Sequence, residues 1–236
     1  MNINFTDLDL QVLTNFSNIN HNIGFKKGNK QQTISTQKNI LVEYQLENKN
    51  EIPEDFCLYD LPEFLNFQDM FDKPKIKLLK TENKIKLSDD EQTSEYYCCD
   101  PNIVVVPTKE MKLPDTFIEF ELTKKQIKSF KKSSKRLKLP DIVFENKSGK
   151  VICKTTDIKN KMSNNVSFEI DKNTNQNFRF HFKMMNLDKI LISNYRVRVS
   201  SKNICELVSK EIPLTYWIAL EENSYFVSVK GDKTNA

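Results

Sequence analysis

The chain has 236 residues and a formal net charge of +4, with 38% hydrophobic and 29% charged residues. This composition excludes a disordered chain, because 16 Phe are spread over segments of alternating polarity. Only four glycines occur, at positions 24, 28, 149 and 231, too few for a glycine-rich phosphate loop, which excludes dinucleotide or P-loop chemistry. The length suits one large domain or two of ordinary size.

The cysteines and histidines form no metal or disulfide pattern. The five cysteines are an odd number without CxxC spacing, and there are two histidines. We therefore expect no zinc site, no disulfide framework and no cofactor. The opening MNINFTDLDL lacks the features of a signal peptide, and no apolar run approaches the roughly 18 residues of a membrane span. We expect a cytosolic protein without membrane contacts.

The first half predicts two helices among short strands. Thr6 is suited to cap a helix whose apolar residues recur at helical spacing up to about Asn20. A second helix is expected over 62–71, where Pro62 stands in the first turn and its missing N–H is harmless. The strands are expected at 3–5, 23–26, 32–36, 41–46, 56–58, 76–80, 84–87 and 95–98.

The second half repeats this order after the run DPNIVVVPTKEMKLP (100–114), which is bracketed by prolines and is typical of a connector between domains. Strand 117–122 leads into Thr123 and a helix up to Lys138, as strand 3–5 leads into Thr6. Further strands are expected at 141–144, 151–155, 166–170, 178–183, 195–200, 204–208 and 214–220, with a short helix over 185–192.

The two halves differ in charge. Residues 1–116 contain 13 Lys and Arg against 19 Asp and Glu, a balance of −6, and the remainder contains 23 against 13, a balance of +10. Opposite charges favour the association of two such units head to tail. The first predicted helix carries Asp7 and Asp9 and no lysine, so a wall built from both helices would be unevenly charged.

The most informative stretch is the second-half helix, TKKQIKSFKKSSKRLK (123–138). At about 100° per residue, one narrow arc holds Ile127, Phe130, Ser134 and Leu137. The opposite arc holds eight basic residues: Lys124, Lys125, Lys128, Lys131, Lys132, Lys135, Arg136 and Lys138. Lysines at a helix start oppose the macrodipole, so helix stability does not explain the first two. A polyanion outside would explain them; the alternative is the solvated face of a lysine-rich protein.

No catalytic constellation is recognisable. His181 alternates with three phenylalanines in strand 178–183, so we expect it on the solvent-facing side of the strand. Spacing suggests no Ser, Cys or Asp partner for it, and the carboxylates form no paired arrangement. We therefore expect a protein that is not an enzyme.

Three segments resemble one family: LYDLPEFLNFQDMF (58–71), YCCDPNIVVVPTKEMKLP (97–114), and YRVRVSS followed by LTYWIALE (195–221). With the order of the elements, they resemble the sliding clamps of T-even-type bacteriophages, which are DNA polymerase processivity factors. The resemblance covers nearly the whole chain, up to about Asn223. The basic net charge, the Lys- and Asn-rich composition and the C-terminal tail depart from those clamps.

The resemblance implies an α+β DNA-clamp fold, with two domains of like topology, helices lining a hole and antiparallel sheets outside, as in proliferating-cell nuclear antigen. The implied parts are domains at 1–100 and 116–223, a connector at 101–115 and a tail at 224–236. Three copies would close head to tail into a homotrimeric ring around double-stranded DNA. The ring would be loaded by an ATP-driven clamp loader and would tether the replicative DNA polymerase in the cytoplasm of the infected bacterial host. The late-transcription machinery is a further candidate partner.

Three candidate surfaces follow from the pattern and the resemblance together. We expect DNA contacts from Lys124, Lys125, Lys128, Lys131, Lys132, Lys135 and Arg136. We expect the subunit interface at the 62–71 helix beside strand 84–87 and at an open edge strand, 166–170, with Phe64, Phe67, Phe71, Val166 and Phe168. A pocket for partner peptides is expected under the connector, formed by Val104, Val105, Val106, Pro107, Tyr216, Ile218 and Leu220. The alternative for this last set is that both segments pack on each other as core.

Two other classes of protein are compatible with a basic helix. A single-stranded DNA or RNA-binding module would interleave cations with exposed aromatic side chains that stack on bases. Phe130 shares the apolar arc with Ile127, so burial is expected for it instead. The third interpretation is a structural or scaffolding protein with an incidental basic face.

Overall fold

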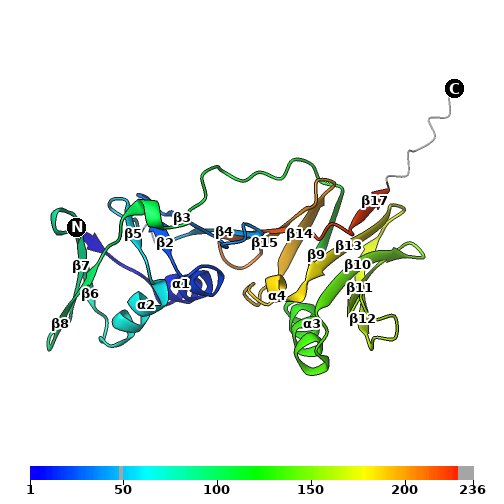
Figure 1. Ribbon diagram of the computed structural model, residues 1–236, viewed down its shortest axis with the longest axis horizontal. Coiled ribbons are helices and arrows are strands. Elements are labelled where there is room, and N and C mark those ends of the chain that lie inside the picture. The colour runs from blue at the N-terminus through cyan, green and yellow to red at the C-terminus, as the bar shows by residue number, and fades with distance from the viewer. Residues whose placement is uncertain (48–49, 228–236) are drawn as a thin grey trace. The chain divides into compact units, whose positions relative to one another are not determined.

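The computed structural model describes residues 1–47 and 50–227. The chain divides into two compact units, one made of Met1–Met111 and Pro213–Tyr216, the other of Lys112–Ile212 and Trp217–Ala236. Strand β16 (Leu214–Ala219) is therefore shared, its first residues belonging to the first unit and the rest to the second. Each unit combines helices with antiparallel strands (Figure 1).

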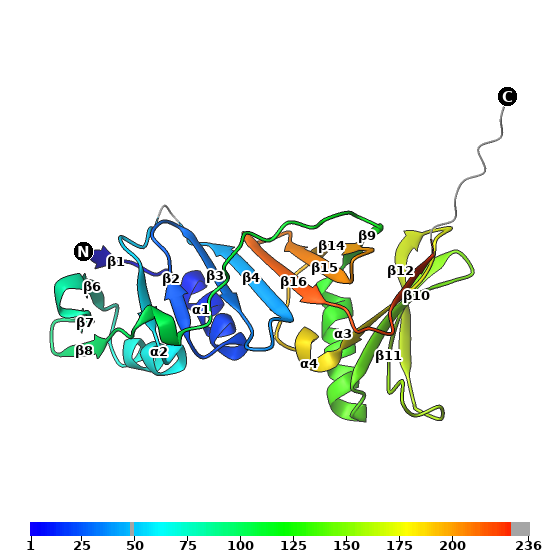
Figure 2. The ribbon, with the colours of Figure 1, turned by 45° about the horizontal axis from the view of Figure 1, so that its top comes forward.

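The first unit contains two helices, α1 (Asp7–Ile19) and α2 (Leu61–Asp69), which lie side by side (Figures 1 and 2). One antiparallel sheet has the order β1-β6-β7-β8, from β1 (Asn2–Ile3), β6 (Lys75–Leu79), β7 (Lys84–Ser88) and β8 (Thr93–Tyr97). The other pairs are β2 (Ile23–Phe25) with β5 (Phe56–Leu58), and β3 (Lys30–Ile34) with β4 (Ile40–Gln45). Helix α1 packs on β3 and β4.

The second unit contains α3 (Lys124–Leu137) and a single-turn helix, α4 (Met184–Leu187). Its larger sheet has the order β12-β11-β10-β13-β17, from β10 (Asp141–Lys147), β11 (Lys150–Thr156), β12 (Val166–Asn173), β13 (Asn177–Lys183) and β17 (Tyr225–Val227). Strand β14 (Tyr195–Ser200) pairs with β9 (Ile118–Leu122) on one side and β15 (Ile204–Ser209) on the other. Helix α3 packs on β11.

The core of each unit joins one helix face to alternating strand positions. In the first unit Val12, Leu13 and Phe16 of α1 are fully buried. In the second, Phe178 and Phe180 stack with ring centroids 4.3 Å apart, and Phe144 meets Phe182 edge-on at 5.8 Å. Phenylalanines therefore supply much of the apolar area that stabilises the second unit.

The helix predictions are confirmed for α1, α2 and α3, with two differences. The helix expected over 185–192 stops at Leu187, because the following N–H groups of Lys189 and Ile190 bond three residues back and tighten the chain into turns. Leu137, expected in the buried stripe, is 46% exposed. Helix α3 ends there at Lys138, which adopts the left-handed conformation (φ 53°) as C-cap.

Two strand predictions were wrong. Strand 84–87, taken as the interface strand, is β7, which lies inside its sheet; the two edge strands of that sheet are β1 and β8. His181 is 2% exposed rather than solvent-facing. Its ring lies between Asp141 and Asn223, which bond Nε2 and Nδ1. Residues 221–224 also bond its backbone: the N–H of Glu221 donates to His181 O, and Ser224 Oγ accepts from His181 N. The edge position of strand 166–170 (in β12) is confirmed. Strand β17 occupies the start of the expected tail, and residues 228–236 lie outside the described part of the chain.

Candidate nucleic-acid interface

Helix α3 starts at a capping box. The N–H of Gln126 donates to Thr123 Oγ1 at 3.3 Å, and the N–H of Thr123 donates to Gln126 Oε1 at 2.9 Å. These two bonds satisfy N–H groups that a helix leaves open at its first turn. The box uses a neutral amide where a carboxylate would also fit, so the first turn of α3 contains no acidic residue. Lys124 and Lys125 therefore lie at the positive end of the helix dipole with no acidic residue in the first turn to offset them.

One face of α3 is buried and the other is cationic. Ile127 and Phe130 are fully buried, and Ser133 joins them because its Oγ donates to Phe130 O at 3.0 Å and reaches Thr155 Oγ1 of β11 at 3.2 Å. The exposed side chains of the helix and its cap are Lys124, Lys125, Lys128, Ser129, Lys132, Lys135, Arg136, Leu137 and Lys138. Within residues 1–47 and 50–227, Lys125, Lys128, Lys132, Lys135 and Arg136 have no ion-pair partner.

Two of the predicted DNA contacts have partners inside the protein. Lys131 Nζ donates to the backbone oxygens of Asp188 (2.8 Å) and Ile190 (2.7 Å), and burial lowers the pKa of this amine. It therefore holds the turns that follow α4 rather than extending from the surface. Lys124 Nζ lies 2.6 Å from Glu211 Oε2. Helical spacing placed Lys124 and Lys131 on the cationic face. Their partners are distant in sequence, so a pattern within the helix could not reveal them.

The corresponding helix of the first unit, α1, has the same start and a different surface. Its capping box pairs Thr6 with Asp9, whose carboxylate also accepts from Tyr44 Oη (2.8 Å) and from the N–H of Glu47 (3.0 Å). Asp9 is fully buried, so the expectation that it charges the helix surface was wrong. The exposed residues of α1 are Asp7, Gln11, Thr14 and Asn18, without a cation.

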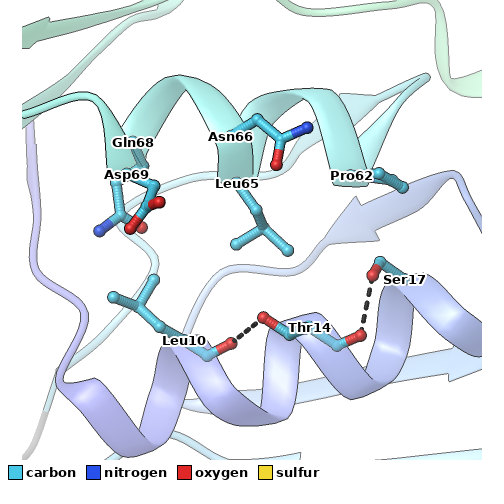
Figure 3. A pocket seen from close by; sticks show the side chains of 8 residues that line it. All are labelled: Leu10, Thr14, Ser17, Pro62, Leu65, Asn66, Gln68 and Asp69. Atoms are coloured by element: carbon cyan, nitrogen blue, oxygen red, sulfur yellow. Dashed lines mark hydrogen bonds between the residues drawn. The ribbon is translucent and has the colours of Figure 1, made fainter.

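A groove of about 350 Å³ runs between α1 and α2 (Figure 3). Its lining contains no basic residue: Leu10, Thr14, Ser17, Pro62, Leu65, Asn66, Gln68 and Asp69. The hydroxyl groups of Thr14 and Ser17 already donate to helix carbonyls, of Leu10 and Thr14 respectively, both at 2.8 Å. The groove therefore offers no positive charge to attract a phosphate.

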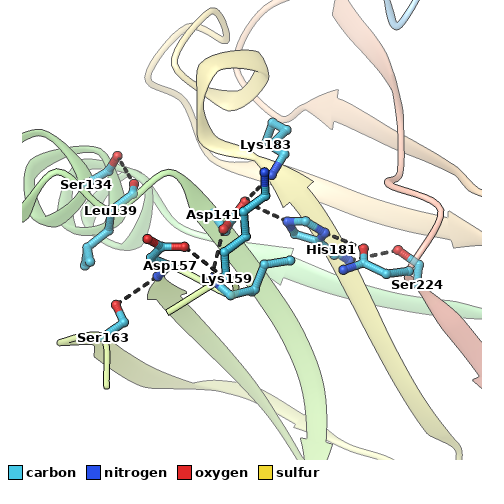
Figure 4. Close-up of polar contacts among 11 residues, drawn as sticks. Ser134, Leu139, Asp141, Asp157, Lys159, Ser163, His181, Lys183 and Ser224 are labelled. Carbon is cyan, nitrogen blue, oxygen red and sulfur yellow. Dashed lines mark hydrogen bonds and ion pairs between the residues drawn. The ribbon is translucent and has the colours of Figure 1, made fainter. Parts of the chain in front are cut away.

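A buried polar cluster follows α3 directly (Figure 4). Asp141, 1% exposed at the start of β10, accepts from His181 Nε2 (2.8 Å), Lys183 Nζ (2.6 Å) and the N–H of Ile158 (3.0 Å). Desolvation acts to raise the pKa of Asp141, but these bonds outweigh it and the pKa is lowered. His181 Nδ1 also bonds Asn223 Oδ1. The cluster stabilises the second unit and ties residues 221–224 to its sheet.

The chain is similar to known proteins in both sequence and structure. Residues 8–105 match the family model described as DNA polymerase processivity factor. The sliding clamp of Escherichia phage RB69 is 24% identical over 222 residues, covering 91% of this chain and 95% of that protein. Among solved structures, the proliferating cellular nuclear antigen of Entamoeba histolytica superposes with a TM-score of 0.68 at 11% identity, over 93% of this chain and 97% of the other. The A. fulgidus PCNA solved with the C-terminal region of FEN-1 bound gives 0.67 at 12% identity, over 95% and 99%.

Over most of its length the chain is similar to the sliding clamps of phages RB69 and KVP40. The expected DNA-clamp fold is confirmed, with mixed helices and antiparallel sheets. No described helix of the chain is both long and apolar enough to cross a bilayer. No group of three or more metal-ligating side chains is found in residues 1–47 and 50–227.

The predicted interface residues lie near two open sheet edges, β8 and β12. Phe64 is buried and Phe67 half-buried, and both meet Tyr96 of β8 edge-on with ring centroids 5.5 Å apart; Phe71 is buried as well. In the second unit, Val166 and Phe168 are half-buried on β12. Phe64 thus packs against β8 without being exposed for contact, whereas Phe67 packs against the same strand and keeps part of its surface exposed.

The predicted pocket residues differ in exposure. Val104 is buried, and Val105, Val106 and Pro107 are half-buried. Tyr216 is fully buried in the first unit, where its Oη donates to Asn15 Oδ1 of α1 at 2.6 Å. Ile218 and Leu220 are buried in the second unit. The strand residues therefore serve the cores of their units, and the connector residues are the accessible part of the set.

Proposed function

We propose that this chain is a sliding clamp that encircles duplex DNA and holds a DNA polymerase on it. The observation that carries the proposal is the α3 face, where Lys125, Lys128, Lys132, Lys135 and Arg136 extend without internal partners from a clamp fold. A sliding ring must attract phosphates without reading bases, and flexible, strongly hydrated lysines suit this better than bidentate arginines. A single-stranded binding module is not favoured, because Phe130 is fully buried and cannot stack on bases.

We infer that three copies close the ring head to tail. Strands β8 and β12 are edges of their sheets, and an unpaired edge is satisfied by an edge strand from a neighbouring copy. The contact is heterologous, so it generates a ring when the rotation closes. The opposite charges of the two halves, −6 for residues 1–116 and +10 for the remainder, guide the fit.

Partner proteins would use the connector. A clamp loader that consumes ATP would open and close the ring in the infected host cell, and the polymerase would dock a short peptide against Val105 and its neighbours. The half-buried valines of the connector support this, because a solvated linker does not normally carry an apolar run. Such a peptide buries little area, so its affinity is modest and depends on one or two anchors.

The test of encirclement is topological. The labelled chain is loaded on a nicked circular duplex with the clamp loader of the same phage and ATP, and half of the sample is then cut once with a restriction enzyme. We expect gel filtration to show the chain bound to the circle and released from the linear DNA. Equal retention on both would show binding without encirclement, and the proposal would fail.

A further inference from the structure

The connector segment 104–106 is fixed by residues that follow helix α1 in the same unit. Asn22 Oδ1 accepts a hydrogen bond from the N–H of Val105 at 2.9 Å. Asn20 Nδ2 donates to Val105 O at 3.3 Å and to Ile34 O of β3 at 2.9 Å. The N–H of Asn22 in turn donates to Asn20 Oδ1 at 3.2 Å. Both backbone groups of Val105 are therefore bonded to side chains, in place of the strand that would otherwise satisfy them.

Gly24 provides the second point of attachment. A Cβ atom at Gly24 would lie 2.6 Å from Val106 Cγ1 and 3.9 Å from Val106 Cβ. The φ of Gly24 is not positive, so this position does not use the conformational freedom of glycine. Glycine is needed at position 24 because Val106 packs directly against its Cα, and any side chain there would displace Val106.

These contacts determine which connector side chain a partner meets. Val104 is buried and Val106 is directed at Gly24. Neighbouring side chains of an extended segment point to opposite sides, so half-buried Val105 faces away from β2. Val105 and Val106 are both half-buried, but Val106 is directed at Gly24, so we infer that Val105 is the valine that faces outward while Val104 and Val106 anchor the segment.

We propose that Asn20, Asn22 and Gly24 are positioning residues for the partner-peptide site, holding the connector so that Val105 is presented at a fixed depth. This inference rests on the proposed function, since it assigns residues to the docking step. The peptide gains affinity because the connector is ordered before binding, which removes an entropic cost from the complex. Asn20 is also the C-cap of α1, so Asn22 and Gly24 are the better positions to vary.

The first test compares Asn22→Ala with Asn22→Asp, which keeps an acceptor oxygen. We expect the alanine variant to exchange the Val105 amide about five-fold faster, the effect of losing one hydrogen bond. It should bind a fluorescent peptide from the C-terminus of the same phage's polymerase about three- to ten-fold more weakly, because the connector is no longer fully ordered before binding. The aspartate variant should match the wild type in both. Unchanged peptide affinity despite faster exchange would overturn the positioning role.

The second test uses a compensating pair. Gly24→Ala forces Val106 outward and should weaken the same peptide about ten-fold, whereas Gly24→Ala combined with Val106→Ala removes the clashing Cγ1 atom and leaves an ordinary contact at 3.9 Å. We expect the double variant to recover to within about two-fold of the wild type. If the double variant bound the peptide as weakly as the single one, the claim that Gly24 positions Val106 would be wrong. If the wild type bound no peptide while loading on DNA normally, the docking function itself would be wrong and this inference with it, while encirclement would stand.

Discussion

Helices α1 and α3 begin alike and present opposite surfaces. Each follows a short strand, starts at a threonine N-cap with a capping box, and has 13 or 14 residues. Yet α1 exposes Asp7, Gln11, Thr14 and Asn18, while α3 exposes mainly lysines. The helix start therefore reflects local backbone chemistry that both units need, and the exposed face is where the two units differ in charge.

The charges in the first turns of α1 and α3 have opposite effects on helix stability. Acidic residues near a helix N-terminus and basic ones near its C-terminus are each stabilising by about 0.3–1 kcal/mol. Helix α1 follows the rule with Asp7 and Asp9. Helix α3 opposes it with Lys124 and Lys125, and only its last turn, with Lys135 and Arg136, agrees. We infer that DNA is held from the α3 side and that the α1 side contributes little.

The largest effect is expected from reversing the free cations of α3. Replacing Lys125, Lys128, Lys132 and Lys135 with Glu should lower duplex binding by about a hundred-fold or more, because each phosphate contact releases counterions. Polymerase processivity should be lost with it. Native mass spectrometry should still show the ring, since these side chains point away from the core. A variant that retained full processivity would remove α3 from the mechanism.

The second-largest effect concerns the buried cluster that follows α3. Asp141→Asn should destabilise the second unit by about 3 kcal/mol at neutral pH, because His181 and Lys183 lose their charged partner. The pKa of Asp141 is lower in the folded protein than its ordinary 3.8, so its contribution is present above that pH and is lost as the pH falls through the folded value.

The free energy of unfolding of the variant and the wild type would be measured in urea at pH 7 and pH 3. Amide hydrogen exchange would then show which unit is destabilised. We expect the difference between variant and wild type to shrink at the lower pH, and amides of α1 to be unaffected. An equal difference at both values would mean that Asp141 stabilises by packing rather than by charge.

The third prediction separates neighbouring lysines of one helix. Lys131→Met should cost about 1–2 kcal/mol of stability, because two backbone oxygens lose their donor, while DNA binding by the folded protein changes little. Lys132→Met should do the reverse, with stability within about 0.5 kcal/mol of the wild type and weaker DNA binding. Thermal unfolding and fluorescence anisotropy on the same two variants suffice. If both variants lost the same DNA affinity, Lys131 would have to contact DNA as well.

The smallest effect is expected at Lys124. Its exposed pair with Glu211 contributes little to stability, since solvent screens it. Lys124→Gln should leave the melting temperature unchanged and should weaken DNA binding less than Lys125→Gln does, because Lys124 is partly neutralised. Titration of both variants on one duplex would decide; a larger loss at Lys124 would indicate that the ion pair opens when DNA binds.

Regular patterns in the sequence predicted most of the framework. Periodicity at Ile127 and Phe130 identified the buried side of α3, and Thr6 and Thr123 marked helix starts that the structure contains. These signals are local (a cap, a turn or an alternation), and they predicted the order of the elements. The clamp fold itself was predicted from the resemblance of three segments to the phage sliding clamps.

What failed depended on segments distant in sequence. His181 was assigned to solvent by alternation, but residues 221–224 cover it. Lys131 was assigned to DNA by helical spacing, but it reaches carbonyls 57 and 59 residues away. Sequence also could not show that strand 84–87 is internal or that Gly24 makes room for Val106. The charge of a face can be predicted from spacing, whereas the use of each charge cannot.

The most direct test of the difference between α1 and α3 is the salt dependence of duplex binding by matched variants. One variant carries Glu at Lys125, Lys128 and Lys132 of α3, and the other carries Glu at Gln11, Thr14 and Asn18 of α1. The slope of log K against log salt counts the phosphates that a protein neutralises, at about 0.9 per contact on duplex DNA. We predict a much shallower slope for the α3 variant and a slope for the α1 variant equal to that of the wild type. Equal changes in both variants would show that DNA is held by both helices, and would contradict the account.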